Sequence, residues 1–541
     1  MIDSISPVRQ SLWAVLAEVA GKYPEAEALV DETRRLTYRQ LIAEADQVAK
    51  ALLALGLEHG DHVGLLRGNS VTWAVHWYAA ASIGLVSVPM NTRFRVEELS
   101  YGLAHEEVRT LLCVDRFLDK IDFIGMLREV EPGLDSQLPG SRLPLLHTLV
   151  VEGEQVPRGA LAYPAFLAAG ERISDAALAT ARAAVHPDDT LLIQLTSGTT
   201  SHPKGVMLSH ASMLGVAQSV AERIGVLPSD RYYSPRPFYH VSGSTMSLLV
   251  ALVKGACLVT ARTFDPALAL QAMAEERCTL TSGNDTMFLM MLAEPSFDPA
   301  RLCLRGGWAA ASPQILQQVV ERMGAVGICN AYGLSEAAPN LVISAADEPL
   351  ALRIDGYMLP HAGISIEIRD PATGQALPAG EVGEICASGW SLMKGYYKLA
   401  DKTAEALREG WLHTGDLGQL DARGRLRFVG RLKDMFRVGG ENVSPLEVEQ
   451  VLLKHPAVEL AQVVGVPDPR LGEVPAAYVT LREGQQAEPE AIIAFCKDRS
   501  ANFKVPRYLK VVEDFDSIGM TGSSKVQKNK LREHAIAAFG L

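Results

Sequence analysis

An α/β fold with a separate small tail is predicted by three features of the sequence. From about residue 36 to about 345, with one less regular stretch, helical patterns alternate with short apolar strand patterns. Between 351 and 430 the texture changes to short strands and Gly-rich turns, and after 434 a compact mixture of helix and strand patterns follows. Alternating strands and helices are typical of a mainly parallel sheet covered by helices. The sequence therefore predicts a large α/β part, a small β-rich subdomain and an α+β tail.

The elements follow in order along the chain. Residues 36–57 have the pattern of a helix that ends at Gly56, and HVGLLRGNS (62–70) that of a buried strand entering a turn. Residues 73–91 predict a helix followed by a short strand. The stretch 131–189, with PGLDSQLPGSRLP and an acidic VVEGEQVP, is interpreted as a surface connection, after which DTLLIQLTSG (189–198) predicts another buried strand.

Composition excludes several classes of protein. A chain of 541 residues predicts about three to four structural units, and 48% hydrophobic with 21% charged residues is ordinary for a folded protein. The net charge of -12 argues against a nucleic-acid partner, which needs a basic surface. The seven cysteines include no CxxC pair, so zinc spacing is absent and reduced thiols are expected. The N-terminus shows the spacing of an amphipathic helix and no leader signature, and no apolar run is long enough to cross a membrane. We therefore expect a cytoplasmic protein without an integral membrane segment.

The segment TSGTTSHPKG (196–205) directly follows the predicted strand LLIQL. A loop of glycines and hydroxyl side chains after a strand can direct backbone N–H groups and hydroxyls at phosphate oxygens, and Lys204 adds a cation. It is not a Walker A loop, because Pro203-Lys204-Gly205 occupies the place of GK[ST]. By itself the segment is equally well explained as a surface turn.

Five further motifs favour a phosphate-binding loop over a surface turn. They are FYHVSG (238–243), NAYGLSEAAP (330–339), GWLHTGD (410–416), GRLKDMFRVGGENVSP (430–445) and TGSSKVQKNKL (521–531). Their order and spacing resemble the adenylate-forming superfamily, which includes acyl-CoA synthetases, the adenylation domains of peptide synthetases and luciferases. The resemblance covers about residues 30 to 535. It implies a large N-terminal domain (1–432) of two α/β subdomains plus a β-barrel-like subdomain at about 351–430, and a smaller, mobile C-terminal domain (433–541).

The resemblance implies an ATP site with Mg²⁺. Segment 196–205 is expected to enclose the β- and γ-phosphates, Tyr332 to lie against adenine, and Asp416, assisted by Arg431, to accept hydrogen bonds from the ribose. Glu336 matches the carboxylate that holds Mg²⁺, which prefers oxygen ligands, and Ser335 stands where the family usually has Thr. The complete implied set for ATP or AMP is Thr196, Ser197, Gly198, Thr199, Thr200, Lys204, Gly307, Tyr332, Gly333, Ser335, Asp416 and Arg431.

The tail carries the implied catalytic lysine. Lys525 matches the lysine that bridges the carboxylate and the α-phosphate during adenylation, and Lys433 stands at the family's hinge. After rotation about Lys433, GGENVSP (439–445) would approach the site, and Gly440 would line a tunnel for the pantetheine arm of CoA, where a side chain would obstruct it. The sequence departs from the family in Ser201 and Ser524, each of which replaces a frequent glycine.

The acyl pocket is expected among residues 240–245, 282–287, 307–310 and 331–340. The implied residues are His240, Trp308, Ala331, Gly333 and Ala337, and His240 also stands near the path of the reacting groups. Trp308 is unusual, because the family generally has a small residue there. We expect either that the indole fills the far end of the pocket and limits the length of the acid, or that it packs outward against a helix. Asp285 stands where relatives often have proline, and helix N-capping is its only evident role.

The implied activity is that of an ATP-dependent carboxylic acid–CoA ligase. It would adenylate a fatty or aromatic acid with release of pyrophosphate and then transfer the acyl group to CoA. An α-amino acid is disfavoured, because Tyr239 and His240 stand where amino-acid-activating relatives carry an aspartate. Two alternatives stay open, namely an enzyme that loads a carrier protein and an inactive sensor of nucleotide or acyl ligand. A homodimer is common in the family, but nothing in the sequence supports one.

Overall fold

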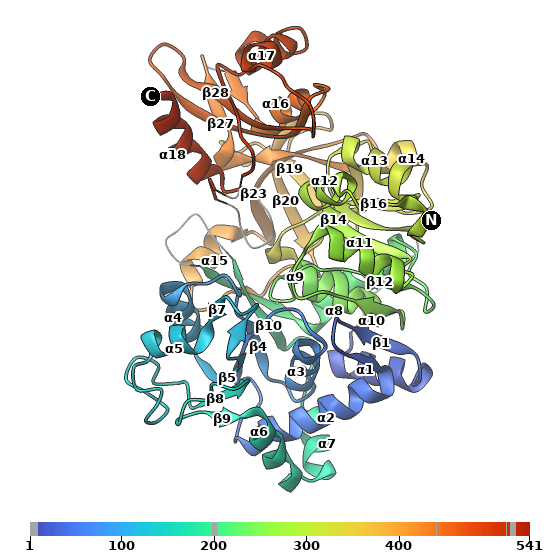
Figure 1. The fold of residues 1–541 in the computed structure, drawn as a ribbon, viewed down its shortest axis with the longest axis vertical. Helices are drawn as coiled ribbons and strands as arrows, with labels where there is room; N and C mark the ends of the chain where they lie inside the picture. Colours follow the sequence, from blue (N-terminus) through green and yellow to red (C-terminus); the bar gives the residue numbers. More distant parts are fainter. Residues whose placement is uncertain (1–8, 197–202, 440, 516, 520–525) are drawn as a thin grey trace.

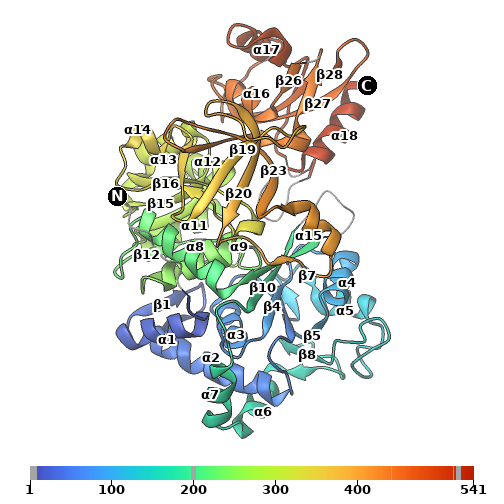
Figure 2. The same cartoon turned by 180° about the vertical axis from the view of Figure 1, so that it is seen from behind.

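The computed structural model of the 541-residue chain describes residues 9–196, 203–439, 441–515, 517–519 and 526–541. Two large sheets and one small sheet organise the molecule, with the C-terminal part at one end of the long axis (Figure 1). Figure 2 shows from behind that α1 and α2 lie far from this end. Among the described residues, no helix combines the length and apolar character needed to cross a bilayer.

The first sheet has eight strands and carries the strands of the predicted phosphate segment. β3, β4, β5 and β8 pair in parallel, whereas β10 and β11 pair antiparallel. Its order is β21 (Gly395–Tyr396), β11 (Lys204–Ser209), β10 (Thr190–Thr196), β4 (Val86–Pro89), β3 (His62–Leu66), β5 (Val108–Val114), β8 (Thr148–Glu152) and β9 (Leu161–Ala162). Its accompanying elements are α2 (Tyr38–Ala54), α3 (Val71–Ser82), α4 (Val96–His105), the hairpin β6 (Arg116–Phe117) and β7 (Ile121–Asp122), α5 (Phe123–Val130), α6 (Tyr163–Ala169) and α7 (Asp175–Ala183).

The second sheet has fourteen strands, and its middle portion is parallel. Its order is β19 (Ile364–Arg369), β20 (Val382–Gly389), β23 (Trp411–Leu420), β24 (Leu426–Arg431), β18 (Tyr357–Pro360), β17 (Val342–Ile343), β16 (Gly327–Tyr332), β15 (Gly306–Ala310), β14 (Leu280–Asn284), β12 (Arg231–Tyr233), β13 (Cys257–Val259), β1 (Glu27–Val30) and β2 (Arg35–Thr37), with β22 (Leu407–Arg408) paired to β23. Its helices are α1 (Leu12–Lys22), α8 (His210–Arg223), α9 (Val241–Gly243), a π-helical turn (Ser244–Leu249), α10 (Val250–Leu252), α11 (Pro266–Glu275), α12 (Asp285–Ala293), α13 (Pro313–Met323), α14 (Leu350–Arg353) and α15 (Ala400–Ala406).

The main hydrophobic core lies between the two large sheets, where residues of α1, α2, α3 and α8 meet residues of both. Separate clusters cover the outer faces, with α4 and α5 on the first sheet and α11, α12 and α13 on the second. Both sheets are thus buried on two sides, which explains why their strands have apolar runs rather than alternation. The α/β class with two sheet-based units is confirmed.

Two expectations need correction. The stretch 131–189 is not only a surface connection, because β8 within it is buried and pairs with β5 along five residues. The β-rich region 351–430 also does not close into a barrel within the described residues. Instead β18 pairs with β17, so these strands continue the second sheet. Short apolar strands and turns specify local strands but not whether a sheet closes on itself.

The C-terminal residues form a third sheet with its own core. The order is β26 (Glu441–Val443), β25 (Phe436–Val438), β28 (Gly472–Leu481) and β27 (Val458–Asp468), with β29 (Tyr508–Val511) paired to β28. α16 (Pro445–Leu452), α17 (Pro489–Lys497) and α18 (Lys528–Phe539) accompany it. The buried residues of this cluster all lie between Phe436 and Ala535. The expected α+β character of the tail is confirmed.

Candidate active site

The two strands that frame the predicted phosphate segment form an antiparallel pair. Thr196 ends β10, Lys204 begins β11, and the two residues are direct partners in the register. Thr196 Oγ1 donates a hydrogen bond to the carbonyl oxygen of Lys204 across 3.2 Å. The chain between them includes Ser197, Gly198, Thr199, Thr200 and Ser201, which lie outside the described residues. The strand predicted before the segment is confirmed, and a second strand begins at Lys204.

Glu336 and Lys204 meet through a tyrosine that the sequence did not single out. Tyr396 lies on β21 beside β11, and its hydroxyl donates a hydrogen bond to Glu336 Oε1 across 2.8 Å. The ammonium group of Lys204 lies 4.0 Å from the centre of the same ring, the geometry of a cation–π contact. Burial and the nearby Glu336 carboxylate raise the pKa of Tyr396, so the hydroxyl stays a donor at neutral pH. A half-buried carboxylate held this way fits a Mg²⁺ ligand.

Tyr332 and Asp416 are hydrogen-bonded across the second sheet. The Tyr332 hydroxyl donates to Asp416 Oδ2 across 2.8 Å, and its ring stacks on Phe428 with centroids 5.2 Å apart. Asp416 is 8% exposed, and its Oδ1 lies 3.6 Å from Arg431 Nε. The two residues are register partners on β23 and β24. Because Arg431 is exposed, its ion pair with Asp416 contributes at most about 1 kcal/mol to stability.

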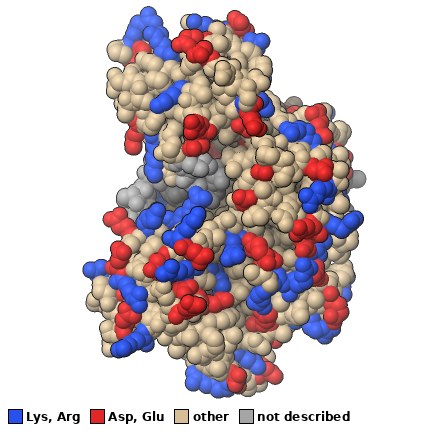
Figure 3. Space-filling view, in the orientation of Figure 1, with Lys and Arg blue, Asp and Glu red and all other residues tan. Residues whose placement is uncertain are grey.

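Positive charge gathers near this carboxylate. Desolvation and the neighbouring Arg431 lower the pKa of Lys433, while Asp434 and Asp416 oppose this shift and Lys204 adds to it. Figure 3 shows the molecule hollowed between its C-terminal part and the rest, with Lys and Arg side chains gathered along the lower edge. Repelling cations at one site favour binding of a polyanion.

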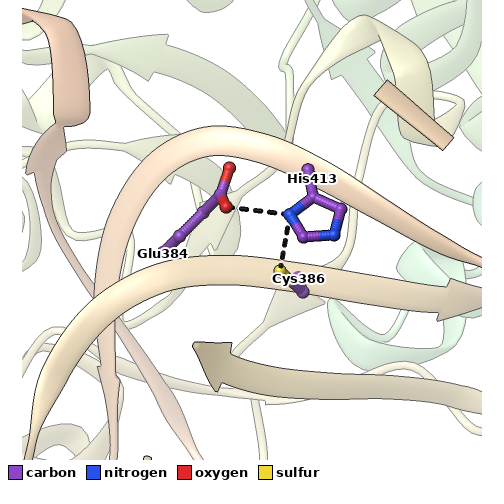
Figure 4. Close-up of side chains that lie close together, drawn as sticks. All are labelled: Glu384, Cys386 and His413. Atoms are coloured by element: carbon purple, nitrogen blue, oxygen red, sulfur yellow. Dashed lines mark hydrogen bonds and ion pairs between the residues drawn. The ribbon is translucent and has the colours of Figure 1, made fainter. Parts of the chain in front are cut away.

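A glutamate on the neighbouring strand holds the backbone before Asp416. Figure 4 shows Glu384 and Cys386 of β20 beside His413 of β23. His413 Nδ1 lies 2.8 Å from Glu384 Oε2 and 3.4 Å from Cys386 Sγ, and Glu384 Oε1 accepts the backbone N–H of Gly415 across 3.1 Å. Both neighbours meet the same ring nitrogen, so we interpret the group as interstrand hydrogen bonds that position the HTGD segment.

The hydrogen bonds of His240 define which of its ring nitrogens carries the proton in the neutral form. Its Nδ1 accepts the backbone N–H of Ser242 across 3.1 Å and lies 2.9 Å from Ser242 Oγ. A nitrogen that accepts from a backbone amide carries no proton itself, so the proton of the neutral ring is on Nε2. In the neutral form His240 therefore presents a donor at Nε2 rather than a base.

Gly307 and Trp308 lie at the centre of the second sheet. A side chain at Gly307 would place Cβ 1.8 Å from the carbonyl oxygen of Thr281 on β14, and the backbone has φ +132°. The glycine thus permits a close approach of the neighbouring strand β14. Trp308 is 4% exposed, and its Nε1 donates to the Tyr232 hydroxyl at 2.7 Å and to the Met246 carbonyl at 3.2 Å. The indole is fastened inside the molecule, and its effect on acid length stays a prediction.

The segment after β16 is small and tightly folded. Ala331, Ser335 and Ala337 are buried, and a Cβ at Gly333 would lie 1.9 Å from the carbonyl oxygen of Pro339. The capping role proposed for Asp285 is wrong, because the Asn284 side chain caps α12 by accepting from Met287 N. Asp285 Oδ1 instead accepts from the backbone and hydroxyl of Ser312 across the gap to α13. The structure describes neither Lys525 nor Ser524 nor Gly440, so their roles stay predictions.

Tyr396 and Glu384 are the two positioning residues that the sequence analysis missed. Tyr396 follows the glycine of the GYY stretch, whose short strand adds to β11 only in the tertiary structure. Glu384 lies 29 residues before His413 in the chain. Sequence alone gives no signal that pairs residues across such distances, although the HTGD motif marks the strand that Glu384 supports.

Comparisons with known proteins identify the family of this chain. Residues 16–397 match the model of the family described as AMP-binding enzyme, and residues 447–525 match that of the AMP-binding enzyme C-terminal domain. The chain is 37% identical to a putative acyl-CoA synthetase, YngI, of Bacillus subtilis, over 99% of this chain and 98% of that protein. It is 33% identical to the mitochondrial medium-chain acyl-CoA ligase ACSF2 of Danio rerio, over 97% of this chain and 88% of the relative.

A solved structure supports the same relationship. The anthranilate CoA ligase AuaEII in complex with anthranoyl-AMP superposes with a TM-score of 0.87 at 26% identity, and the match covers 100% of both chains. The first family model matches well over half of the sequence, and the second matches the C-terminal part. This chain therefore belongs to the family of AMP-binding enzymes.

Proposed function

We propose that this protein is an ATP-dependent carboxylic acid–CoA ligase that acts on a fatty or aromatic acid. A carboxylate oxygen attacks the α-phosphorus of ATP, pyrophosphate leaves, and the acyl-adenylate forms. The thiol of CoA then attacks the acyl carbonyl and loses its proton, and AMP leaves. Relatives named as medium-chain acyl-CoA and anthranilate CoA ligases support an acid of one of these two kinds.

One observation carries the proposal. Within the segment 332–336, Tyr332 bonds to Asp416 and Glu336 bonds to Tyr396, so that one short turn contacts both a candidate ribose carboxylate and the strand that begins at Lys204. A nucleoside triphosphate lying along this turn would have its ribose at Asp416 and its phosphates near Lys204.

The attack joins two anions, so the site must neutralise charge and align the groups. We assign that work to Lys204 at the β- and γ-phosphates and to Lys525 between the carboxylate and the α-phosphate. Glu336 would hold Mg²⁺, which neutralises phosphate charge when bound. His240 donates from Nε2 toward the acid's carboxylate, which agrees with its hydrogen bond from Ser242 N–H.

The two half-reactions are assigned to two positions of the C-terminal domain, with the boundary between 1–432 and 433–541. The separate hydrophobic core after residue 436 supports that boundary, as do family models that end at 397 and begin again at 447. Rotation about Lys433 would withdraw Lys525 and present Gly440 to the pantetheine arm.

A screen of pyrophosphate release tests the proposal. The full chain is incubated with ATP, MgCl₂ and a panel of aliphatic and aromatic acids, with and without CoA, and acyl-CoA is measured by mass. We expect acid-dependent pyrophosphate release and an acyl-CoA product. Release without thioester would favour a carrier protein as acceptor, and no release with any acid would contradict the proposed enzyme.

A further inference from the structure

Within the described part of the chain, Arg236 is a buried cation without a counter-charge. It lies in the loop between β12 and α9 and is 8% exposed, yet its Nε and Nη2 have no hydrogen-bond partner among the residues described. Among the residues that the structure describes, Arg236 forms no ion pair with a carboxylate. Burial lowers the pKa of Arg236 to about 10, so it is still a cation at neutral pH.

Another buried arginine of this chain, Arg353, is bonded quite differently. Arg353, 6% exposed, donates from Nε, Nη1 and Nη2 to the carbonyl oxygens of Glu348, Ile328 and Val326. Arg353 therefore has its polar atoms satisfied by the protein itself. Burying a charge without hydrogen bonds carries a large penalty, and proteins generally retain it only where something else pairs with it.

The surroundings of Arg236 connect it to the expected acyl pocket. Its guanidinium carbon lies 4.3 Å from the centre of the Trp308 ring, a cation–π contact. Trp308 is held at the edge of its ring by the hydrogen bonds from Nε1 to Tyr232 and Met246. Arg236 is also only four residues before His240, on the same loop. One wall of the expected pocket thus consists of an indole with an arginine stacked on it.

The immediate neighbourhood is polar as well. Ser234 Oγ lies 2.7 Å from Ser247 Oγ and 3.1 Å from Ser282 Oγ, and the Tyr232 hydroxyl donates to Met246 O. These hydroxyls bond to one another and none neutralises the arginine. A pocket for a plain alkyl tail would have an apolar end, because alkyl groups offer no acceptor to a guanidinium.

We propose that Arg236 selects an acid whose far end carries a second hydrogen-bond-accepting group, a second carboxylate above all. This inference rests on the proposed ligase function, since it names the substrate class of the same site. The guanidinium would donate from Nε and Nη2 to two oxygens of that group, the side-on geometry that arginine forms with carboxylates. Trp308 would keep the guanidinium plane in place and so set the distance between the two ends of the acid.

Matched pairs of acids test this proposal. Pyrophosphate release in the presence of CoA is measured for butyric against succinic acid, hexanoic against adipic acid and octanoic against suberic acid, with 6-hydroxyhexanoic acid as a neutral acceptor. At one chain length we expect kcat/KM to be at least tenfold higher for the dicarboxylic acid than for its monocarboxylic partner. At the other lengths the second carboxylate would not be positioned for the bidentate contact with Arg236.

Variants assign the preference to the arginine. Arg236→Met keeps a long side chain over the indole but removes the donors, and it should lower the preference for the dicarboxylic acid at least tenfold while sparing the monocarboxylic acid. Arg236→Lys keeps the charge and should retain part of the preference for the dicarboxylic acid. It replaces Arg236→Met in the comparison if the Met variant fails to fold. Arg67→Met is the matched control, since Arg67 is 5% exposed on the other sheet and pairs with Glu152. It should leave the preference unchanged.

The result that overturns the proposal is a wild-type enzyme that prefers the monocarboxylic acid at every length, with a ratio that Arg236→Met does not change. If no acid supports pyrophosphate release, the proposed function is wrong. The inference about Arg236 is then tested separately by calorimetric measurement of acid binding. Tighter binding of adipate or suberate to wild type than to Arg236→Met would then support an acid site at Arg236, and equal binding would refute it.

Discussion

The hydroxyl of Tyr332 donates a hydrogen bond to Asp416 Oδ2 across 2.8 Å, although 84 residues separate the two in the chain. The bond joins the end of β16 to β23 through β17, β18 and β24, so it depends on the order of strands in the second sheet. It also orients the carboxylate that we assign to the ribose.

Removing this bond should weaken ATP binding. Tyr332→Phe takes one donor from a buried carboxylate, and a hydrogen bond to a charged group contributes about 1.5–3 kcal/mol. We expect the KM for ATP to rise about tenfold, with a smaller change in the KM for the acid. Tyr357→Phe is the control, since its hydroxyl contacts Gln419 in the same β-rich region. Equal effects of the two variants would contradict the assignment.

Response to Mg²⁺ should depend on Tyr396. Tyr396→Phe frees Glu336 from its hydroxyl donor, and we expect the Mg²⁺ concentration for half-maximal activity to rise several-fold, with Glu336→Gln raising it further. Tyr397→Phe is a close control, because the hydroxyl of the neighbouring tyrosine donates to Glu107 instead. Titration of Mg²⁺ at saturating ATP makes the comparison, and an unchanged midpoint in Tyr396→Phe would exclude the positioning role.

Lys525→Ala should separate the two half-reactions. We expect adenylation to slow by orders of magnitude, because the cation that bridges carboxylate and α-phosphate is lost. Thioester formation from supplied acyl-adenylate should be largely spared, since Lys525 would be withdrawn for that step. Rapid-quench measurements of each step, with Lys530→Ala as control, test the idea. Equal loss in both steps would argue against it.

Stability should fall as the pH rises because of Glu106. This carboxyl is fully buried, its Oε2 has no hydrogen-bond partner among the residues that the structure describes, and burial raises its pKa from 4.5 to about 8. The folded state therefore keeps a proton that the unfolded chain releases, so the contribution is fully present below pH 4.5 and is lost as the pH rises through about 8.

The free energy of unfolding by urea, measured between pH 5 and pH 9, tests the prediction for Glu106. Glu106→Gln should flatten the decline over that window. Glu107→Gln is the control with the opposite environment, because a hydrogen bond from Lys398 lowers the pKa of Glu107. A decline that persists unchanged in Glu106→Gln would show that another group is responsible.

Gly307→Ala should destabilise the sheet at the site. The new Cβ would lie 1.8 Å from the Thr281 carbonyl oxygen, so strands β14 and β15 would have to separate. We expect a loss of about 2–4 kcal/mol in the free energy of unfolding, within the range for severe overpacking and backbone strain. Gly374→Ala, with φ +74° and nothing within 4 Å of its Cβ, should cost only about 1 kcal/mol. A comparable loss in both would remove the steric explanation.

The sequence determined the class of the fold and the identities of most candidate residues. Alternating strand and helix patterns predict buried parallel strands because backbone periodicity is local, and motifs such as HTGD and YGLSE lie within a few residues. The same locality explains the failures. Asp285 was assigned to its own helix, whereas its carboxylate contacts Ser312 on the next one, and the β-rich region was expected to close although β18 continues into β17.

Only the tertiary structure decided which of these residues meet. Tyr332 reaches Asp416, and Tyr396 connects Glu336 with the strand of Lys204. Arg236 lies on Trp308, and no carboxylate in the described part of the chain pairs with it. Each contact joins segments tens of residues apart, and their distance is set by strand order and register rather than by spacing along the chain. Residue types thus name the chemistry that is available, while packing between the sheets decides which charges are paired and which one is left for a ligand.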